Sequence, residues 1–97
     1  MIGYRFLSSA EIEMTEASAF YEAATSGLGS DFLDEIQRVI HLLCQHPELG
    51  RSIDHGFRQA LLHRFPFGLI YSLETDAMLI IAVAHQHRRP GYWRDRA

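Results

Sequence analysis

The residues best suited to chemistry lie at the end of the chain. Met78–Ala84 is the most apolar run of the sequence, and a segment rich in histidine, arginine and aromatic residues follows it directly. That segment contains His85, His87, Arg88, Arg89, Tyr92, Trp93 and Arg94. Arginine binds phosphate as a planar fork, histidine transfers protons near neutral pH, and aromatic rings stack on bases or fill a partner's pocket. We therefore expect a buried strand to deliver these side chains to one edge of a domain.

The two histidines of this segment allow three interpretations. Alternation along a strand places His85 and His87 on one side, if the strand extends that far. A metal site would need three or four ligands, and no cysteine or carboxylate lies at a recognisable spacing, so we expect no metal. In-line cleavage of RNA would need a base, an acid and a cation for the phosphate. In the third interpretation His85 is a hydrogen-bonded residue at a strand end and His87 is solvated.

Cleavage of RNA would use residues from two strands and from the segment after them. The catalytic candidates are His63, Arg64, His85, His87, Arg88 and Tyr92. The candidates for contact with a target or with phosphate are Arg58, Arg89, Trp93 and Arg94. Which of Arg58, His63 and Arg64 faces the histidines depends on the register between the strands. The two aromatic residues could instead form a lid over the hydrophobic edge of the sheet.

The composition predicts one ordinary globular domain spanning residues 1–97. Of the 97 residues, 47% are hydrophobic and 22% are charged. The longest apolar run has about seven residues, far short of the roughly 20 that cross a bilayer, and the N-terminus lacks the apolar segment of a signal peptide. The single cysteine, Cys44, excludes an internal disulfide and is expected to be a packed core residue. We therefore expect a cytoplasmic protein with no membrane partner and no small-molecule cofactor.

Charge is distributed unevenly along the chain. The net charge of −3 argues against indiscriminate binding to nucleic acid. Residues 1–50 contain two arginines and eight acidic residues, whereas residues 51–97 contain seven arginines and four acidic residues. There is no lysine, so all nine basic residues are arginines. This asymmetry predicts a basic functional face in the second half of the chain.

Two helices are predicted in the first half. Ser8 begins a capping-box pattern, and apolar residues then recur at spacings of three and four as far as Ala24. The acidic residues of this helix are expected to form a solvated face: Glu11, Glu13, Glu16 and Glu22. Ser30 is expected to cap a second helix, which ends near His46 because Pro47 disfavours helical geometry in the residue before it. Joined by so few residues, the two helices should form an antiparallel hairpin.

Strand-like periodicity dominates the remainder of the chain. Residues 2–7 predict a first strand, and three more are predicted over residues 57–63, 69–73 and 78–85, after a polar loop at 51–56. The order β-α-α-β-β-β predicts an α+β fold, an antiparallel sheet with an N-terminal α-helical hairpin packed on one face. The last strand is apolar at almost every position, which favours a central place, next to the first strand and covered on both sides.

Five stretches of the sequence resemble, in their order and spacing, the RelE/ParE superfamily of bacterial toxins. They are Ala17–Glu22, Leu28–Ile36, His46–Gly50, Arg64–Tyr71 and Ile81–Trp93. Members of this superfamily are toxins of type II toxin–antitoxin systems and have also been called plasmid-stabilisation proteins. The helical hairpin and the Pro-Glu-Leu-Gly junction at residues 47–50 are more similar to the ParE-like members. The resemblance implies the same β-α-α-β-β-β fold that periodicity predicts.

The resemblance implies a growth-inhibiting toxin that a cognate antitoxin protein neutralises. Similarity to ParE-like members implies DNA gyrase as the target. The alternative is a RelE-like, ribosome-dependent and metal-independent mRNA endonuclease. The lysines of the RelE-type site are absent, and Arg58, Arg64 and Arg88 could replace their charge but not a titrating role, because arginine stays protonated. A further alternative is a non-toxic module that only binds an antitoxin.

Overall fold

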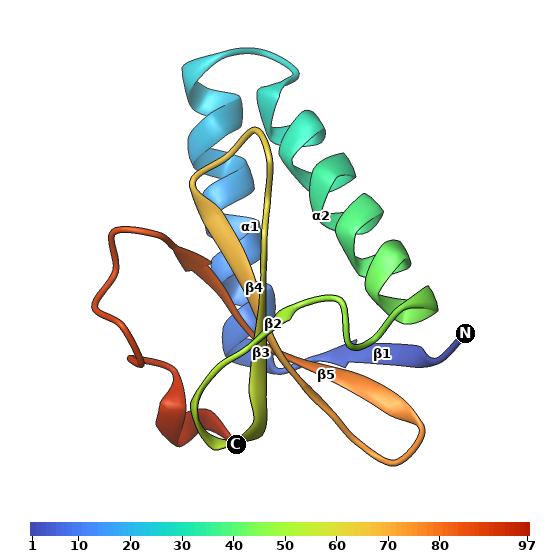
Figure 1. The fold of residues 1–97 in the computed structure, drawn as a ribbon. Coiled ribbons are helices and arrows are strands. Elements are labelled where there is room, and N and C mark those ends of the chain that lie inside the picture. The colour runs from blue at the N-terminus through green and yellow to red at the C-terminus, as the bar shows by residue number, and fades with distance from the viewer.

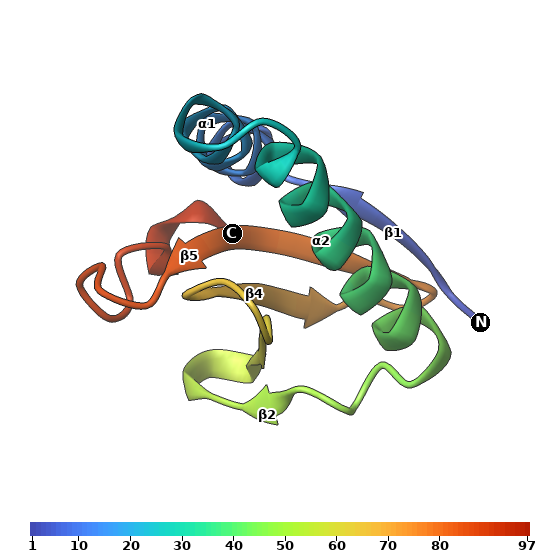
Figure 2. The same ribbon diagram turned by 90° about the horizontal axis from the view of Figure 1, so that it is seen from above.

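A helical hairpin covers one face of a five-stranded sheet in the computed structural model, which describes residues 1–97 (Figure 1). The helices are α1 (Ser8–Ala24) and α2 (Leu28–Gln45). The strands are β1 (Gly3–Phe6), β2 (Arg51–Ser52), β3 (Phe57–Leu61), β4 (Phe67–Leu73) and β5 (Ala77–His85). Single 3₁₀ turns lie at η1 (Asp54–Gly56) and η2 (Arg94–Arg96). Seen from above, the helices form one layer and the sheet the other, so the predicted α+β fold is confirmed (Figure 2).

The strand order in the sheet is β1-β5-β4-β3-β2. The neighbouring pairs from β2 to β5 are antiparallel, but β1 and β5 are parallel, with Tyr4 opposite Met78 and Phe6 opposite Ile80. The sheet is therefore mixed: the predicted antiparallel pairing holds for every neighbouring pair except β1 and β5. The difference arises because the helical hairpin carries the chain from β1 to the opposite edge, and the later strands return step by step. The predicted place of the last strand, beside the first, is confirmed.

The core lies on both faces of β5. On the helix side, Phe32, Ile36 and Ile40 of α2 are at most 2% exposed and belong to the same cluster as Ile80. On the opposite face a smaller cluster forms around Ile81. Its members are Phe57, Ile70, Leu79, Ile81, Ala82, Ala84 and Trp93. Cover on both sides explains why β5 is apolar at successive positions instead of alternating. Neither helix combines the length and the apolarity needed to span a membrane.

The two helices are joined and capped in an unexpected way. Helix α1 begins at Ser8 itself, with Leu7 before it and no side-chain cap, so the predicted capping box does not form. Helix α2 begins after Gly27, three residues before the predicted cap Ser30. The carboxylate of Glu22 accepts hydrogen bonds from the backbone N–H groups of Gly27 (2.9 Å) and Gly29 (3.0 Å). These bonds hold the pKa of Glu22 below its usual value, and a residue expected only to be solvated caps the neighbouring helix.

A buried tyrosine fixes the junction between α2 and the sheet. The Tyr71 hydroxyl accepts a hydrogen bond from the N–H of Gly50 (3.0 Å) and donates one to the carbonyl of Pro47 (2.8 Å). Only glycine fits at position 50, because a Cβ there would lie 2.4 Å from that hydroxyl oxygen. The next residues form β2, so part of the predicted polar loop is a short edge strand.

Candidate functional site

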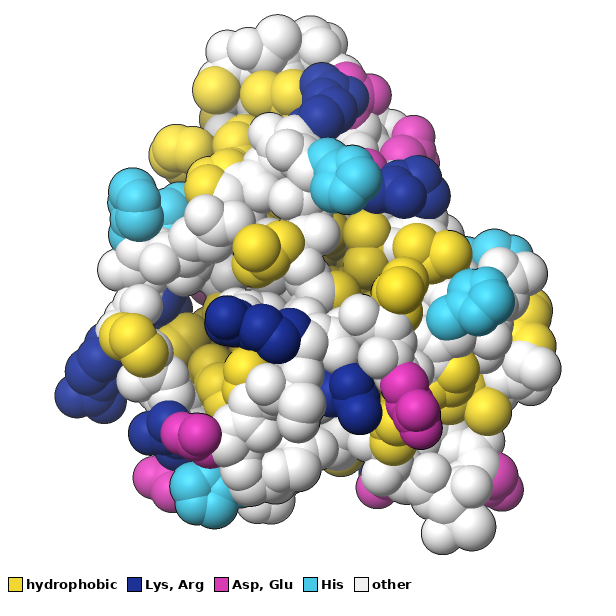
Figure 3. All heavy atoms as spheres, viewed as in Figure 1, with side chains coloured by type: hydrophobic (Ala, Val, Ile, Leu, Met, Phe, Trp, Pro, Cys, Tyr) yellow, Lys and Arg dark blue, Asp and Glu magenta, His cyan; other side chains and the backbone are white.

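Arginines surround a groove on the sheet face opposite the helices. The groove has a volume of about 550 Å³ and lies between the β2–β3 region and the segment after β5. Its polar lining includes Arg51, Arg88, Arg89, Arg94, His85, Gln59, Gln86 and Asp54. Figure 3 shows arginine side chains around a hollow with a hydrophobic floor at the lower left of the molecule. Asp54 is the only acidic residue of the lining, so the predicted basic face takes the form of a basic groove in an acidic protein.

The β2–β3 region and the C-terminal segment meet across this groove. Arg51 of β2 donates from Nη2 to the side chain of Gln59 (3.0 Å), which fixes Arg51 beside β3. Arg94 donates from Nη2 to Oδ2 of Asp54 (2.7 Å), an ion pair between exposed side chains. Of the groove's arginines only Arg94 has a carboxylate partner, so Arg51, Arg88 and Arg89 keep positive charges that no ion pair neutralises.

Trp93 serves as a packing residue and not as a surface contact. The residue is 6% exposed, and its ring meets the Phe57 ring edge to face, with 5.0 Å between the ring centroids. A partner at the surface could reach little of this ring. The burial of Trp93 thus supports its interpretation as a lid residue and argues against its interpretation as a contact to a target.

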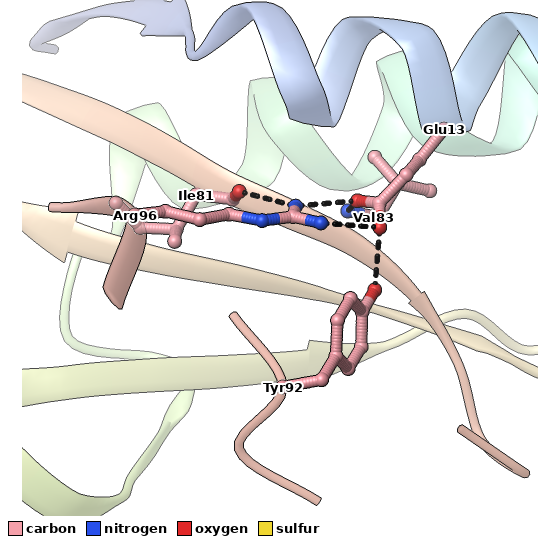
Figure 4. Close-up of polar contacts among 5 residues, drawn as sticks. All are labelled: Glu13, Ile81, Val83, Tyr92 and Arg96. Carbon is pink, nitrogen blue, oxygen red and sulfur yellow. Dashed lines mark hydrogen bonds and ion pairs between the residues drawn. The ribbon is translucent and has the colours of Figure 1, made fainter. Parts of the chain in front are cut away.

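A second polar cluster holds the C-terminal segment to α1 (Figure 4). Arg96 forms a two-bond pair with Glu13, from Nη1 to Oε1 and from Nη2 to Oε2, both 2.9 Å. The Tyr92 hydroxyl donates to Glu13 Oε2 (2.7 Å), and the Val83 N–H donates to Oε1 (3.0 Å). Arg96 Nη1 also donates to the carbonyl of Ile81 (3.1 Å). The side chains of Glu13 and Arg96 are only 14% and 21% exposed, so this pair is largely shielded from solvent.

The cluster shifts the pKa values of its members in opposite directions. Burial alone would raise the pKa of Glu13, but the hydrogen bonds from Arg96, Tyr92 and Val83 outweigh burial and lower it. Burial and the bond to Glu13 raise the pKa of the Tyr92 phenol. The guanidinium of Arg88 also lies over the Tyr92 ring, 3.9 Å from its centroid. Tyr92 is therefore a neutral hydrogen-bond donor that is committed to Glu13.

His85 is the only histidine in the groove lining. Its Nδ1 accepts a hydrogen bond from the backbone N–H of His87 (3.0 Å), so the ring of neutral His85 carries its proton on Nε2. The rings of Phe67 and His87 lie edge-on to it, with centroids 5.0 and 5.1 Å away. Strand β5 ends at His85, and His87 lies in the turn after it, exposed to solvent. One nitrogen of one histidine is thus available for proton transfer in the groove.

The other predicted site residues do not reach the groove. Arg58 donates from Nη1 to the carbonyls of Glu48 (3.1 Å) and Gly50 (2.7 Å), because its side chain lies at the junction with α2. The remaining two candidates are His63 and Arg64. They follow β3, which ends at Leu61, in a turn directed towards α2. There Arg64 pairs with Asp31 of α2 (3.5 Å).

His63 is fixed in the same turn. Its backbone N–H donates to Glu35 Oε2 (2.8 Å), and Glu35 also pairs with Arg38. The register between the strands could have brought Arg58, His63 or Arg64 to the histidines after β5, but all three lie outside the groove that His85 lines.

Sequence reasoning missed one residue of the groove, Arg51, and two of the second polar cluster, Glu13 and Arg96. A signal for Glu13 was present, since it lies three residues after Ala10 and four before Ala17, on the apolar side of α1. Nothing local distinguishes Arg51 or Arg96 from other exposed arginines, because their partners are distant in the sequence.

Comparisons with known proteins agree with this fold. Residues 4–90 match the family described as "ParE toxin of type II toxin-antitoxin system, parDE". Among solved structures, the "Chromosomal ParDE TA system from P. aeruginosa" shares the fold, with a TM-score of 0.65 and 16% sequence identity over 88% of this chain and 96% of that chain. No curated protein matches the sequence at a significant level. Because the family match extends over most of its residues, this chain belongs to the ParE toxin family of type II toxin–antitoxin systems.

Proposed function

We propose that this protein inhibits bacterial growth by acting on DNA gyrase and that a cognate antitoxin protein neutralises it. The observation that carries the proposal is the match to the ParE toxin family over residues 4–90. A toxin of a type II system is encoded with a protein partner that suppresses it. The similar solved structure is itself described as a ParDE toxin–antitoxin system.

The chemistry of the groove supports binding over catalysis. General acid–base cleavage needs two groups that exchange protons, both within hydrogen-bond reach of the reacting atoms. His85 offers only Nε2, and the Tyr92 hydroxyl is committed to the Glu13 carboxylate. His63 and Arg64 are held near α2 by Glu35 and Asp31. The groove therefore offers one imidazole nitrogen and several fixed positive charges, which suits recognition of an anionic surface on a target.

We infer that Arg88 and Arg89 are the main contacts to the target. Both are exposed, both line the groove, and neither forms an ion pair. Arg94 contributes its charge once its ion pair with Asp54 is broken. Trp93 supports the segment by packing against Phe57. Fixed arginines at a groove rim bind carboxylates or phosphates through paired hydrogen bonds.

A second candidate is a ribosome-dependent, metal-independent mRNA endonuclease. The observation in its favour is that His85 shares the groove with Arg88 and Arg89, so a proton-transfer group and phosphate ligands lie together. Under this alternative His85→Ala abolishes toxicity. Under the gyrase proposal the same variant leaves most of the toxicity.

Induced expression in bacteria tests the toxin role directly. We expect growth arrest, and recovery of growth when the protein encoded beside the toxin is co-expressed. The double variant Arg88→Gln/Arg89→Gln should lose toxicity while keeping its circular dichroism spectrum. The matched control, Arg5→Gln/Arg38→Gln, removes two arginines that lie outside the groove and should remain toxic. Normal growth with the unaltered protein, together with a stable complex with its partner, would identify a non-toxic binding module instead.

A further inference from the structure

The edge of β5 changes its partner midway along the strand. Strand β1 pairs with β5 only as far as Ile80, where the N–H of Leu7 donates to the Ile80 carbonyl (3.0 Å). The chain then leaves the sheet to begin α1. At the same point the pairing with β4 shifts, since Ile70 is opposite Ala82 and Tyr71 is opposite Ile80, so Ile81 has no partner on β4. Such a bulge turns the following backbone groups and exposes an edge.

Side chains take the place of the missing strand at this edge. The Ile81 carbonyl accepts a hydrogen bond from Arg96, and the Val83 N–H donates one to Glu13. The two side chains also bind each other through two charge-assisted bonds, and Tyr92 donates to the same carboxylate. The Glu13 carboxylate and the Arg96 guanidinium thus pair with the backbone N–H of Val83 and the carbonyl of Ile81, as a neighbouring strand would.

The C-terminal segment, residues 88–97, which supplies Arg96, forms few other contacts with the rest of the molecule. From residue 88 onward its backbone hydrogen bonds are local, and the only one that reaches the sheet joins the Arg88 N–H to the carbonyl of His85. The ion pair between Arg94 and Asp54 is exposed to solvent and therefore contributes little. Gly91, with φ of 78°, provides a backbone conformation that few other residues adopt. The packing of Trp93 and the bonds to Glu13 are what hold the segment closed.

We propose that residues 90–97 form a hinged cover and that Glu13, Arg96 and Tyr92 form the latch that closes it. Opening the latch exposes the β5 edge at Val83 and removes the wall that Tyr92 and Trp93 give to the groove. The two effects occur together because the Glu13 carboxylate binds both the β5 edge, at Val83, and the cover, at Tyr92 and Arg96. The cover is a property of the fold and is independent of the proposed target.

Hydrogen exchange and fluorescence test the latch in the whole protein. Arg96→Ala leaves Glu13 in place as the acceptor for Val83, so faster exchange there reports opening of the latch and not removal of the acceptor. We expect the Val83 amide to exchange at least about tenfold faster. Acrylamide quenching of Trp93, the only tryptophan, should also rise. The Leu43 amide, buried in α2, should exchange as before.

Two further variants sharpen the test. Asp95→Asn changes the charge next to Arg96 without touching the latch. It should alter neither the exchange rate of the Val83 amide nor the quenching of Trp93. Tyr92→Phe removes one hydroxyl and should give the same pattern as Arg96→Ala, but smaller. Unchanged exchange at Val83 in Arg96→Ala, or exchange that rises equally at Val83 and Leu43, would overturn the proposal, because the first shows no latch and the second shows only global destabilisation.

Discussion

Replacing Tyr71 by phenylalanine removes one oxygen atom from the centre of the molecule. The Tyr71 side chain is fully buried, and its hydroxyl bridges the Gly50 N–H and the Pro47 carbonyl. The phenyl ring keeps the shape of the original side chain, so the change creates almost no cavity. Gly50 is buried as well, so its N–H cannot reach water to replace the lost partner.

The expected loss in the free energy of unfolding follows from these two hydrogen bonds. A buried donor left without a partner costs about 1–3 kcal/mol, and the lost bond to Pro47 adds about 0.5–1.5 kcal/mol. We therefore expect Tyr71→Phe to lower the free energy of unfolding by about 1.5–4.5 kcal/mol. For a domain of this size each kcal/mol lowers the melting temperature by about 4–8 °C, so the decrease should be at least about 6 °C.

Urea unfolding followed by circular dichroism measures this change. Tyr4→Phe is the matched control, because Tyr4 is 43% exposed and its hydroxyl forms no hydrogen bond, and its effect should stay within about 0.5 kcal/mol. If Tyr71→Phe is as stable as the control, the hydroxyl does not fix the junction and the reasoning fails. A weakened junction should also loosen β2, which carries Arg51 into the groove.

Three further predictions concern the helical hairpin and the latch. Glu22→Ala should lower the midpoint of urea unfolding, since it removes the acceptor for the Gly27 and Gly29 N–H groups at the start of α2. Glu16→Ala, at another exposed position of α1, should leave the midpoint nearly unchanged, and equal midpoints for the two variants would contradict the cap. Gly29→Ala should cost about 1–3 kcal/mol, because its Cβ would lie 2.5 Å from a backbone oxygen of α1, and an unchanged melting temperature would contradict this close contact. The lowered pKa of Glu13 contributes stability that is present above the ordinary glutamate pKa of 4.5 and is lost as pH falls through the pKa of the folded state. Urea unfolding at about pH 6 and about pH 3 should therefore show a smaller loss in Glu13→Gln than in the unaltered protein, and equal losses would refute the contribution.

Much of the fold was predictable because it follows from periodicity. The spacing of apolar residues indicated both helices, and the unbroken apolar run of β5 indicated a central strand covered on both faces. Strand boundaries were less accurate at the turn after β3, where the strand ends at Leu61 and not at residue 63. The Leu62 N–H there bonds to the Phe67 carbonyl and closes the turn, a tertiary detail that propensity does not contain.

The helix caps and the site depended on contacts between distant residues. Ser8 and Ser30 had the right chemistry for caps, but the acceptor for the start of α2 is Glu22 on the other helix. In the same way Arg58 and Arg64 had the charge expected of a phosphate ligand. Each is occupied by a partner that sequence reasoning could not place, a backbone carbonyl for Arg58 and Asp31 for Arg64.

The segment after β5 attracted attention for its possible chemistry. Its arginines at positions 88 and 89 line the groove. Its aromatic residues instead attach the segment to the body of the molecule, Trp93 through Phe57 and Tyr92 through Glu13. The segment therefore both lines the groove and attaches itself to the body of the molecule.

The most direct test of the proposed function is a DNA supercoiling assay with purified gyrase, ATP and relaxed plasmid. The account predicts that the purified protein inhibits supercoiling, that its co-purified antitoxin abolishes the inhibition, and that Arg88→Gln/Arg89→Gln inhibits much less than the unaltered protein. Messenger RNA extracted from the same expressing cells should remain intact. Undisturbed supercoiling, together with mRNA cleaved on ribosomes and protected by His85→Ala, would contradict the account and establish the endonuclease.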